Sequence, residues 1–183
     1  MGKLSIDKTI YSSKPNDGRR LEKEMAIYNL LEQLEISYLR MDHDAADTIE
    51  DCKEIESILG IKICKNLFLC NRQKTRFYLL VMPGNKRFVT KEVSKQIGSS
   101  RLSFADAEDM EKYLNTTPGS ASILGLMNDK EHKVHLLIDR EIIESKYFGC
   151  HPCINTSSLK LKTSDILEKF LPYTGHEPCI VEL

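Results

Sequence analysis

The sequence predicts a mixed α/β domain in which helices flank a mixed sheet. Three observations lead to this fold class. Helical and strand-like patterns are intermixed along the chain, hairpin signals are too frequent for a doubly wound parallel sheet, and 183 residues suffice for one domain with a sizeable core. A hydrophobic content of 41% with 29% charged residues is typical of a soluble globular protein.

The first elements follow from residue periodicity. Residues 18–36 predict an amphipathic helix because apolar side chains recur there at helical spacing, and residues 37–44 alternate like a strand. Residues 48–60 predict a second helix, with Thr48 and Asp51 as a capping pair and Gly60 as its C-terminal stop.

A hairpin is the clearest signal in the middle of the chain. Two apolar runs, at 66–71 and 75–84, are joined by the polar turn Asn71–Lys74. Beyond them we expect short helices at 90–98 and 106–114, a buried strand at 133–141, a strand-like segment at 154–163, a helix at 164–175 and the final segment 177–183. We expect residues 1–16 to form a loosely held N-terminal extension and residues 17–183 to form one domain.

Membrane and secretory functions are not indicated. No apolar run approaches the roughly 18 residues that a membrane span needs, and residues 1–20 lack the apolar stretch of a signal peptide. We therefore expect a cytoplasmic protein without a membrane partner, whose cysteines are reduced.

A redox pair or a metal site is suggested by the cysteine spacing at one place only. Among Cys52, Cys64, Cys70, Cys150, Cys153 and Cys179, the spacing of a redox or metal pair occurs only in Cys150-His-Pro-Cys153. A structural zinc site usually needs a second pair. A thioredoxin-type pair should begin a helix, whereas a strand-like segment follows Cys153. We expect no metal and no cofactor, and interpret the two cysteines as incidental.

The charge is unevenly distributed along the chain. Residues 62–101 hold ten basic residues and one acidic residue, a net charge of +9, while the remainder carries −10. The acidic residues of segment 42–56 can neutralise this block as part of a solvated face. Alternatively, the block forms a local surface for a phosphate backbone. The candidate residues for this surface are Arg72, Lys74, Arg76, Lys86, Arg87, Lys91 and Lys95.

A small-residue loop at 116–126, TTPGSASILGL, can bring a ligand close to the backbone and offer N–H groups to an oxygen. It is not a P-loop, and no G-x-G-x-x-G or G-x-S-x-G motif occurs. No Ser-His-Asp or Cys-His arrangement has a recognisable context, so no covalent nucleophile is predicted.

In this order, KNLFL (65–69), PGSASILGL (118–126) and HPCINTSSL (151–159) resemble the YbaK/ProX-type aminoacyl-tRNA editing domains. The resemblance runs from about Leu21 to Leu171 and is strongest to the free-standing alanyl-tRNA(Pro) deacylases. It implies a YbaK/ProX-like α+β fold with a central barrel-like sheet. It also implies hydrolysis of alanine wrongly attached to proline tRNA, with prolyl-tRNA(Pro) spared.

The resemblance also implies site residues. Lys65 matches the essential catalytic lysine and Asn66 its neighbour, and His151 matches the pocket histidine. Substrate-binding positions are completed by the loop residues Gly119, Ser120 and Ala121 and by a polar pair on the following strand, Asn155 and Thr156. One departure is Ile123, which stands where the family loop commonly has proline.

The chemistry implied by the family is modest, because an aminoacyl ester is already activated. Lys65 would position the RNA end and stabilise developing negative charge, backbone N–H groups near Gly119 would bind the oxyanion, and the terminal hydroxyl of the tRNA would assist. We expect His151 to act as a pocket wall and hydrogen-bond donor. The implied partners are alanyl-tRNA(Pro) and, transiently, prolyl-tRNA synthetase, but not DNA. A catalytically silent tRNA-binding or synthetase-associated module is the alternative, and a thiol-redox protein is a further one.

Overall fold

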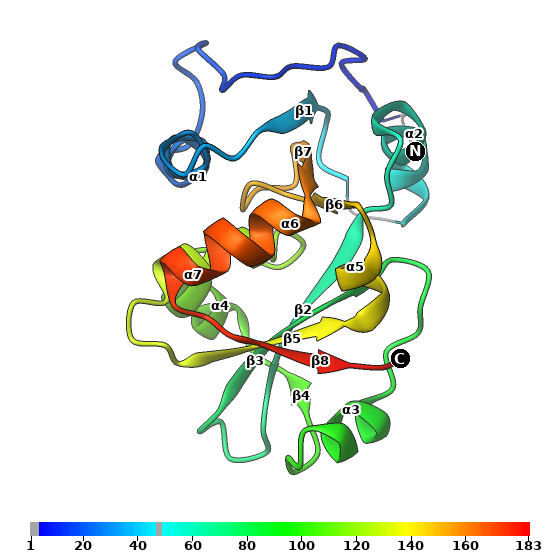
Figure 1. Cartoon of the computed structure of the whole chain (residues 1–183), viewed down its shortest axis with the longest axis vertical. Coiled ribbons are helices and arrows are strands. Elements are labelled where there is room, and N and C mark those ends of the chain that lie inside the picture. The colour runs from blue at the N-terminus through cyan, green and yellow to red at the C-terminus, as the bar shows by residue number, and fades with distance from the viewer. Residues whose placement is uncertain (1–3, 47–48) are drawn as a thin grey trace.

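A computed structural model of the chain describes residues 4–46 and 49–183, with the backbone alone described at 49–51. Helices and strands are intermixed along the chain, as Figure 1 shows. The elements are α1 (Glu22–Gln33), β1 (Tyr38–Asp42), α2 (Ile49–Leu59), β2 (Cys64–Cys70), β3 (Phe77–Pro83), α3 (Thr90–Gln96), β4 (Ser103–Phe104), α4 (Ala107–Leu114), η1 (Ile123–Asn128), β5 (Val134–Asp139), α5 (Arg140–Glu144), β6 (Tyr147–Cys150), β7 (Ser157–Lys162), α6 (Thr163–Asp165), η2 (Ile166–Phe170), α7 (Leu171–Thr174) and β8 (Pro178–Val181).

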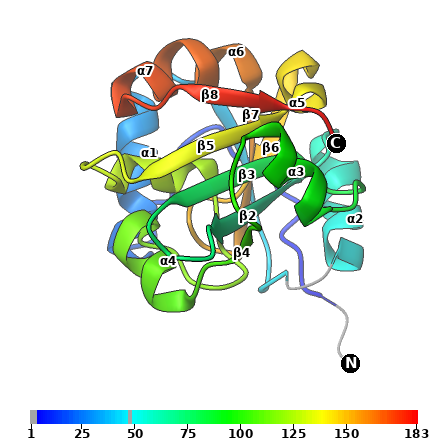
Figure 2. The same cartoon turned by 90° about the horizontal axis from the view of Figure 1, so that it is seen from below.

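The strands form two sheets. The larger sheet has the order β4-β2-β3-β5-β8, with antiparallel pairing on the β4 side of β3 and parallel pairing on the other side (Figure 2). The smaller sheet, β1-β7-β6, is antiparallel throughout. The expected mixed sheet with flanking helices is confirmed. The barrel-like closure is not found, because strand pairing between the two sheets, within the described residues, is limited to one bridge between Ile63 and Gly149.

Two cores cover opposite faces of the large sheet. One face packs Leu69, Leu80 and Met82 against Val93 of α3. The other face packs Leu79 and Val81 into a larger core that includes α1, α4, η1 and the helical segment 163–174. Strand β3 is buried at every position, since both of its faces are covered.

The expected helices and strands are present, with boundaries shifted by a few residues. The hairpin at β2 and β3 pairs in register from Cys64↔Pro83 to Cys70↔Phe77. Gly60 follows α2 with φ +62°, the left-handed conformation typical of a helix stop. The Thr48/Asp51 cap lies outside the described residues.

The N-terminal segment is held more closely than expected. Residues 4–14 run beside β1, with isolated bridges from Ile6 to His43 and from Tyr11 to Arg40. The guanidinium of Arg40 lies 4.4 Å from the centre of the Tyr11 ring. Lys14 reaches α1, where its Nζ donates a hydrogen bond of 2.8 Å to Glu32. The domain boundary after residue 16 stays a prediction.

The contact at Gly149 generates a stability prediction. A Cβ atom at this position would lie 2.6 Å from the Lys62 carbonyl oxygen and 2.7 Å from Ile61 Cδ1. Backbone cannot yield as a flexible side chain can, so we expect Gly149→Ala to destabilise the fold by about 1–3 kcal/mol. Urea unfolding would measure this loss.

The control is Gly98→Ala. Gly98 has φ +61° and nothing within 4 Å of an added Cβ, so its substitution reports only backbone strain. A Gly149→Ala protein as stable as the wild type would show that the two sheets can separate without cost.

Candidate functional site

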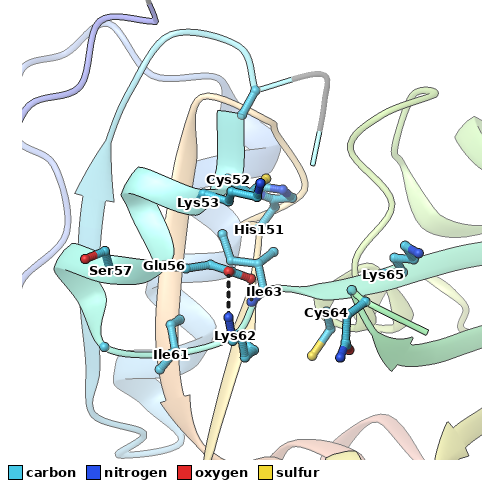
Figure 3. A pocket seen from close by; sticks show the side chains of 14 residues that line it. Cys52, Lys53, Glu56, Ser57, Ile61, Lys62, Ile63, Cys64, Lys65 and His151 are labelled. Carbon is cyan, nitrogen blue, oxygen red and sulfur yellow. Dashed lines mark hydrogen bonds and ion pairs between the residues drawn. The ribbon is translucent and has the colours of Figure 1, made fainter. Parts of the chain in front are cut away.

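Two cavities meet around the start of β2. The larger, of about 830 Å³, lies between α2, the Gly60–Lys65 segment and the turn after β3 (Figure 3). The smaller, of about 530 Å³, is lined by β2, Phe104 and the Gly119 loop. Cys64, Lys65 and His151 line both cavities, so the sheet junction brings a lysine of one sheet and a histidine following a strand of the other to the same place.

Lys65 is held by the turn that follows β3. Its Nζ donates a hydrogen bond of 2.8 Å to the carbonyl oxygen of Lys86. The Lys86 ammonium is fixed in turn by Asp139, which is fully buried, at 2.9 and 3.2 Å, and by Glu141. An ammonium has three N–H donors, so this one bond positions Lys65 and leaves donors for a ligand.

Asn66 fastens the small-residue loop to β2. Its Oδ1 accepts a hydrogen bond of 3.1 Å from the backbone N–H of Ile123. This contact accounts for the departure at Ile123, because a proline there would have no N–H to donate. Ile123 itself is fully buried in the larger core.

The loop presents Gly119 and Ala121 to the smaller cavity. Gly119 has φ +86°, which disfavours any other residue. Ser120 is buried and does not line the cavity. Its Oγ donates to the Thr117 carbonyl at 2.9 Å and accepts from the Thr117 N–H at 3.0 Å, and so braces the turn. Within the described residues, the N–H groups of Gly119 and Ala121 have no acceptor.

His151 has its tautomer set by a backbone carbonyl. Its Nδ1 lies 2.9 Å from the oxygen of Ser157, which can only accept, so Nδ1 donates. Burial lowers the pKa of His151, and the neighbouring His43 lowers it further. The neutral ring therefore offers Nε2 as an acceptor. His151 lines both cavities, and its expected role as a pocket wall and hydrogen-bond donor to the substrate stays a prediction.

The polar pair Asn155 and Thr156 does not lie on a strand. Both residues stand in the turn before β7, Thr156 is exposed, and neither lines the two cavities. Their carbonyl oxygens accept from the N–H groups of Ala46 and His43. The structure therefore places this pair apart from Lys65 and His151, and its expected role in substrate binding stays a prediction.

The two neighbouring cysteines are buried and reduced. Cys150 and Cys153 are 0% and 1% exposed. Burial raises the pKa of both thiols, that of Cys153 to about 12. Since the thiolate is the reactive form, these positions do not favour redox chemistry.

The basic residues of segment 62–101 divide into paired and unpaired groups. Lys86 pairs with buried Asp139, and Lys74 pairs with Asp106 at 2.7 Å. Arg72, Lys74 and Arg76 lie in the β2–β3 turn, so their alternation does not define one face of a strand. No acidic partner lies within ion-pair distance, among the described side chains, of Arg72, Arg76, Arg87, Lys91, Lys95 or Arg101.

The acidic segment 42–56 neutralises little of this block. Lys62 and Glu56, 3.3 Å apart, form the single described ion pair between the two segments. Glu56 also accepts from the Ile63 N–H and so ties α2 to the start of β2.

Comparison with known proteins identifies the family to which this chain belongs. Residues 43–169 match the family described as "Aminoacyl-tRNA editing domain". The chain belongs to this family. It is therefore an aminoacyl-tRNA deacylase, an enzyme that hydrolyses an ester, and the resemblance inferred from its motifs is confirmed.

Individual relatives agree with this assignment. The chain is 31% identical to "Prolyl-tRNA editing protein ProX" of Acetoanaerobium sticklandii over 163 residues, 89% of this chain and 99% of that protein. It is 28% identical to "Prolyl-tRNA synthetase associated domain-containing protein 1" of Danio rerio, over 88% of this chain and 86% of that one. A solved structure described as a proposed trans-editing enzyme for prolyl-tRNA synthetase has a TM-score of 0.67 at 13% identity, covering 90% of this chain and 99% of that one, and shows a shared fold.

One residue next to the site was missed from the sequence. His43 is buried, with its ring centre 6.3 Å from that of His151, and its Nε2 lies 2.9 Å from Ser158 Oγ. Burial lowers its pKa as well. A lone histidine after a strand gives no sequence signal, since its neighbours come from β7, more than 100 residues away.

In the part of the chain that the structure describes, no helix is long and apolar enough to cross a membrane, and no three His, Cys, Asp or Glu side chains form a group that could hold a metal ion.

The histidine pair predicts a pH dependence of stability. Because the folded pKa of His43 and of His151 is lowered, the unfolded chain binds more protons as pH falls through about 6.5. The free energy of unfolding should therefore decrease between pH 7.5 and 5.5. In His151→Asn, whose amide can still donate to Ser157, the decrease should be shallower. Urea unfolding across this range measures it, and equal slopes would contradict the assignment.

Proposed function

We propose that this protein hydrolyses alanyl-tRNA(Pro), releasing alanine and free tRNA(Pro), and spares prolyl-tRNA(Pro). The observation that carries the proposal is the composition of the smaller cavity. Its lining includes Lys65, His151, Gly119 and Ala121 and no acidic residue, and the backbone N–H groups of Gly119 and Ala121 have no acceptor among the described residues. Such a lining favours the binding of an ester and of the oxyanion formed from it.

The residues act on the ester by position and charge. The Lys65 ammonium lies at the cavity and stabilises the negative charge that develops when water attacks the ester carbonyl. The N–H groups of Gly119 and Ala121 donate to the same oxyanion. The Nε2 atom of His151 accepts a hydrogen bond from the α-ammonium of the alanyl group. The bond from carbonyl carbon to ribose oxygen then breaks. The oxygen of the water stays on the alanine carboxyl group, and a proton from that water passes to the ribose oxygen, which leaves as a hydroxyl.

Selectivity for alanine rests on cavity size. A synthetase pocket built for proline discriminates poorly against a smaller side chain, since a missing methylene costs only about 1–3 kcal/mol. A second pocket that is too small for proline corrects this error. The walls that set its size are the buried His151 ring and the loop held by Asn66.

The partners follow from the substrate. The names of the relatives, which refer to prolyl-tRNA editing and to a prolyl-tRNA synthetase associated domain, support tRNA(Pro) as substrate and a transient contact with that synthetase. Water is the one co-substrate that hydrolysis requires. We place the reaction in the cytoplasm, where tRNA is aminoacylated.

The main test is Lys65→Ala. We expect kcat/KM for alanyl-tRNA(Pro) to fall by roughly 100-fold or more, because an oxyanion donor is lost. The measurement is release of labelled alanine, with prolyl- and cysteinyl-tRNA(Pro) as comparison substrates. Wild-type protein should leave prolyl-tRNA(Pro) intact.

Lys130→Ala is the matched control, since Lys130 is an exposed lysine that lines neither cavity. It should retain wild-type turnover. Near-normal turnover in Lys65→Ala would remove the catalytic assignment. Wild-type protein that binds tRNA but hydrolyses no ester would establish the silent binding module instead.

His151→Ala tests the size-based sieve. Removal of the ring enlarges the cavity, so the ratio of alanyl to prolyl hydrolysis should fall even if both rates drop. The ratio is the informative quantity, because discrimination is a difference between two transition-state free energies. Loss of alanyl hydrolysis with no gain on larger esters would make His151 a catalytic or structural residue.

A further inference from the structure

Phe104 is an exposed aromatic residue at the edge of the large sheet. Its side chain is 64% exposed, more than that of any other large hydrophobic residue described. It lies on β4, the edge strand, which pairs with β2 through Leu69 and Phe104 (Figure 1). A single exposed hydrophobic residue is ordinary in itself, so the neighbours of Phe104 decide whether its position can serve a ligand.

The ring of Phe104 is held in place by a second phenylalanine. Phe88 packs against the core between the large sheet and α3, and its ring centre lies 6.0 Å from that of Phe104 at an interplanar angle of 64°. This edge-to-face contact orients Phe104 and leaves most of its surface accessible. The pair is thus a fixed aromatic surface anchored in the core.

Basic side chains flank the same pair. Arg87, Lys91 and Arg101 line a cavity of about 630 Å³ together with Phe88. No acidic group lies within ion-pair distance of these three side chains among the described residues. An open patch of three unneutralised cations suits a polyanion.

The aromatic pair connects this basic patch with the editing cavity. Phe88 lines the cavity with Arg87 and Arg101, and Phe104 lines the cavity with Lys65 and Gly119. A strand that places its end at Lys65 and continues past Phe104 reaches the three basic side chains next. Phosphate groups spaced along such a strand would meet these charges.

We propose that Phe104, supported by Phe88, is a stacking platform for an unpaired nucleobase near the 3′ end of the RNA substrate, with Arg87, Lys91 and Arg101 contacting the adjoining phosphates. This inference rests on the proposed function, because it assumes that the esterified RNA end enters the Lys65 cavity. Stacking on an aromatic face is tolerant of base identity, so this platform supplies affinity and orientation rather than sequence selectivity.

A single-stranded nucleic acid fits this surface better than a protein does. One exposed ring with flanking cations provides too little apolar area for a stable protein interface. Aromatic side chains combined with a basic groove are instead the combination that binds single-stranded nucleic acid.

The experiment measures binding of a fluorescent RNA hairpin with an unpaired CCA end that carries alanine through a 3′ amide, which cannot be hydrolysed. Phe104→Ala should raise its Kd roughly 5- to 100-fold. Phe104→Tyr should restore binding, because it keeps the aromatic face. Phe104→Leu, which keeps apolar bulk without that face, should bind as weakly as the alanine variant.

Two controls isolate stacking. Tyr173 on α7 is 48% exposed and lines neither cavity, so Tyr173→Ala should leave the Kd unchanged. The same hairpin with a blunt end should bind wild type and Phe104→Ala equally. An unchanged Kd in Phe104→Ala, or a Phe104→Leu protein that binds like wild type, would overturn the platform.

The salt dependence tests the phosphate contacts. Each of Arg87→Gln, Lys91→Gln and Arg101→Gln should reduce the slope of log Kd against log salt by about 0.7, as fewer counterions are released. Unchanged slopes in all three variants would overturn that part of the proposal. Hydrolysis by wild-type protein separates failure of the proposed function from failure of the stacking platform. If wild type binds the hairpin but cleaves no alanyl ester, the proposed function fails. If wild type cleaves the ester while Phe104→Ala binds the hairpin normally, only the platform fails.

Discussion

The contact between Gly149 and the Lys62–Ile63 backbone determines how the rest of the molecule is arranged. Among the described residues, it is the one strand bridge between the two sheets. Only a residue without Cβ allows β6 to approach this closely. Because Lys65 follows Ile63 by two residues and His151 follows Gly149 by two, the close approach brings a cation of one sheet and a histidine near the other to the lining of the same cavities. The editing cavity is therefore a consequence of the junction between the sheets.

A second set of contacts supports the site from behind. Buried Asp139 fixes the Lys86 ammonium, and the Lys86 carbonyl accepts from Lys65. A buried carboxylate is costly unless it is paired, so Asp139 and Lys86 stabilise each other, and their ion pair fixes the turn after β3 that carries Lys86. Lys86 thus contributes to the site through its backbone while its side chain pairs with Asp139 and Glu141, and its expected contact with tRNA stays a prediction. On the other side, Asn66 holds the loop through the Ile123 N–H. Lys65 is consequently positioned between two fixed turns.

The sequence could predict features that depend on neighbouring residues, such as strands and motifs. It could not predict features that arise where distant segments of the chain meet. Two apolar runs located β2 and β3, and alternation located β7. The three ordered motifs pointed to Lys65, Gly119 and His151, which line one cavity. The division into two sheets could not be predicted, since it depends on the single approach of Gly149 to Ile63. The same holds for His43, which becomes relevant only because β7 places Ser158 and His151 beside it. Asn155 and Thr156 look strand-like in sequence, yet their carbonyls bond to the segment after β1, and the strand begins one residue later.

The electrostatics of the cavity explain why so few polar side chains suffice. Cys64 is buried with its pKa raised to about 12, and His151 is held neutral by burial, so Lys65 is the one charged group expected on the smaller cavity's lining at neutral pH. A single cation in a partly desolvated space acts more strongly on a developing oxyanion than it would in water. A carboxylate nearby would neutralise it and weaken this effect. In the proposed reaction, a lining without acidic groups leaves the Lys65 charge unneutralised, and an activated ester needs charge stabilisation and a positioned water more than it needs a strong base.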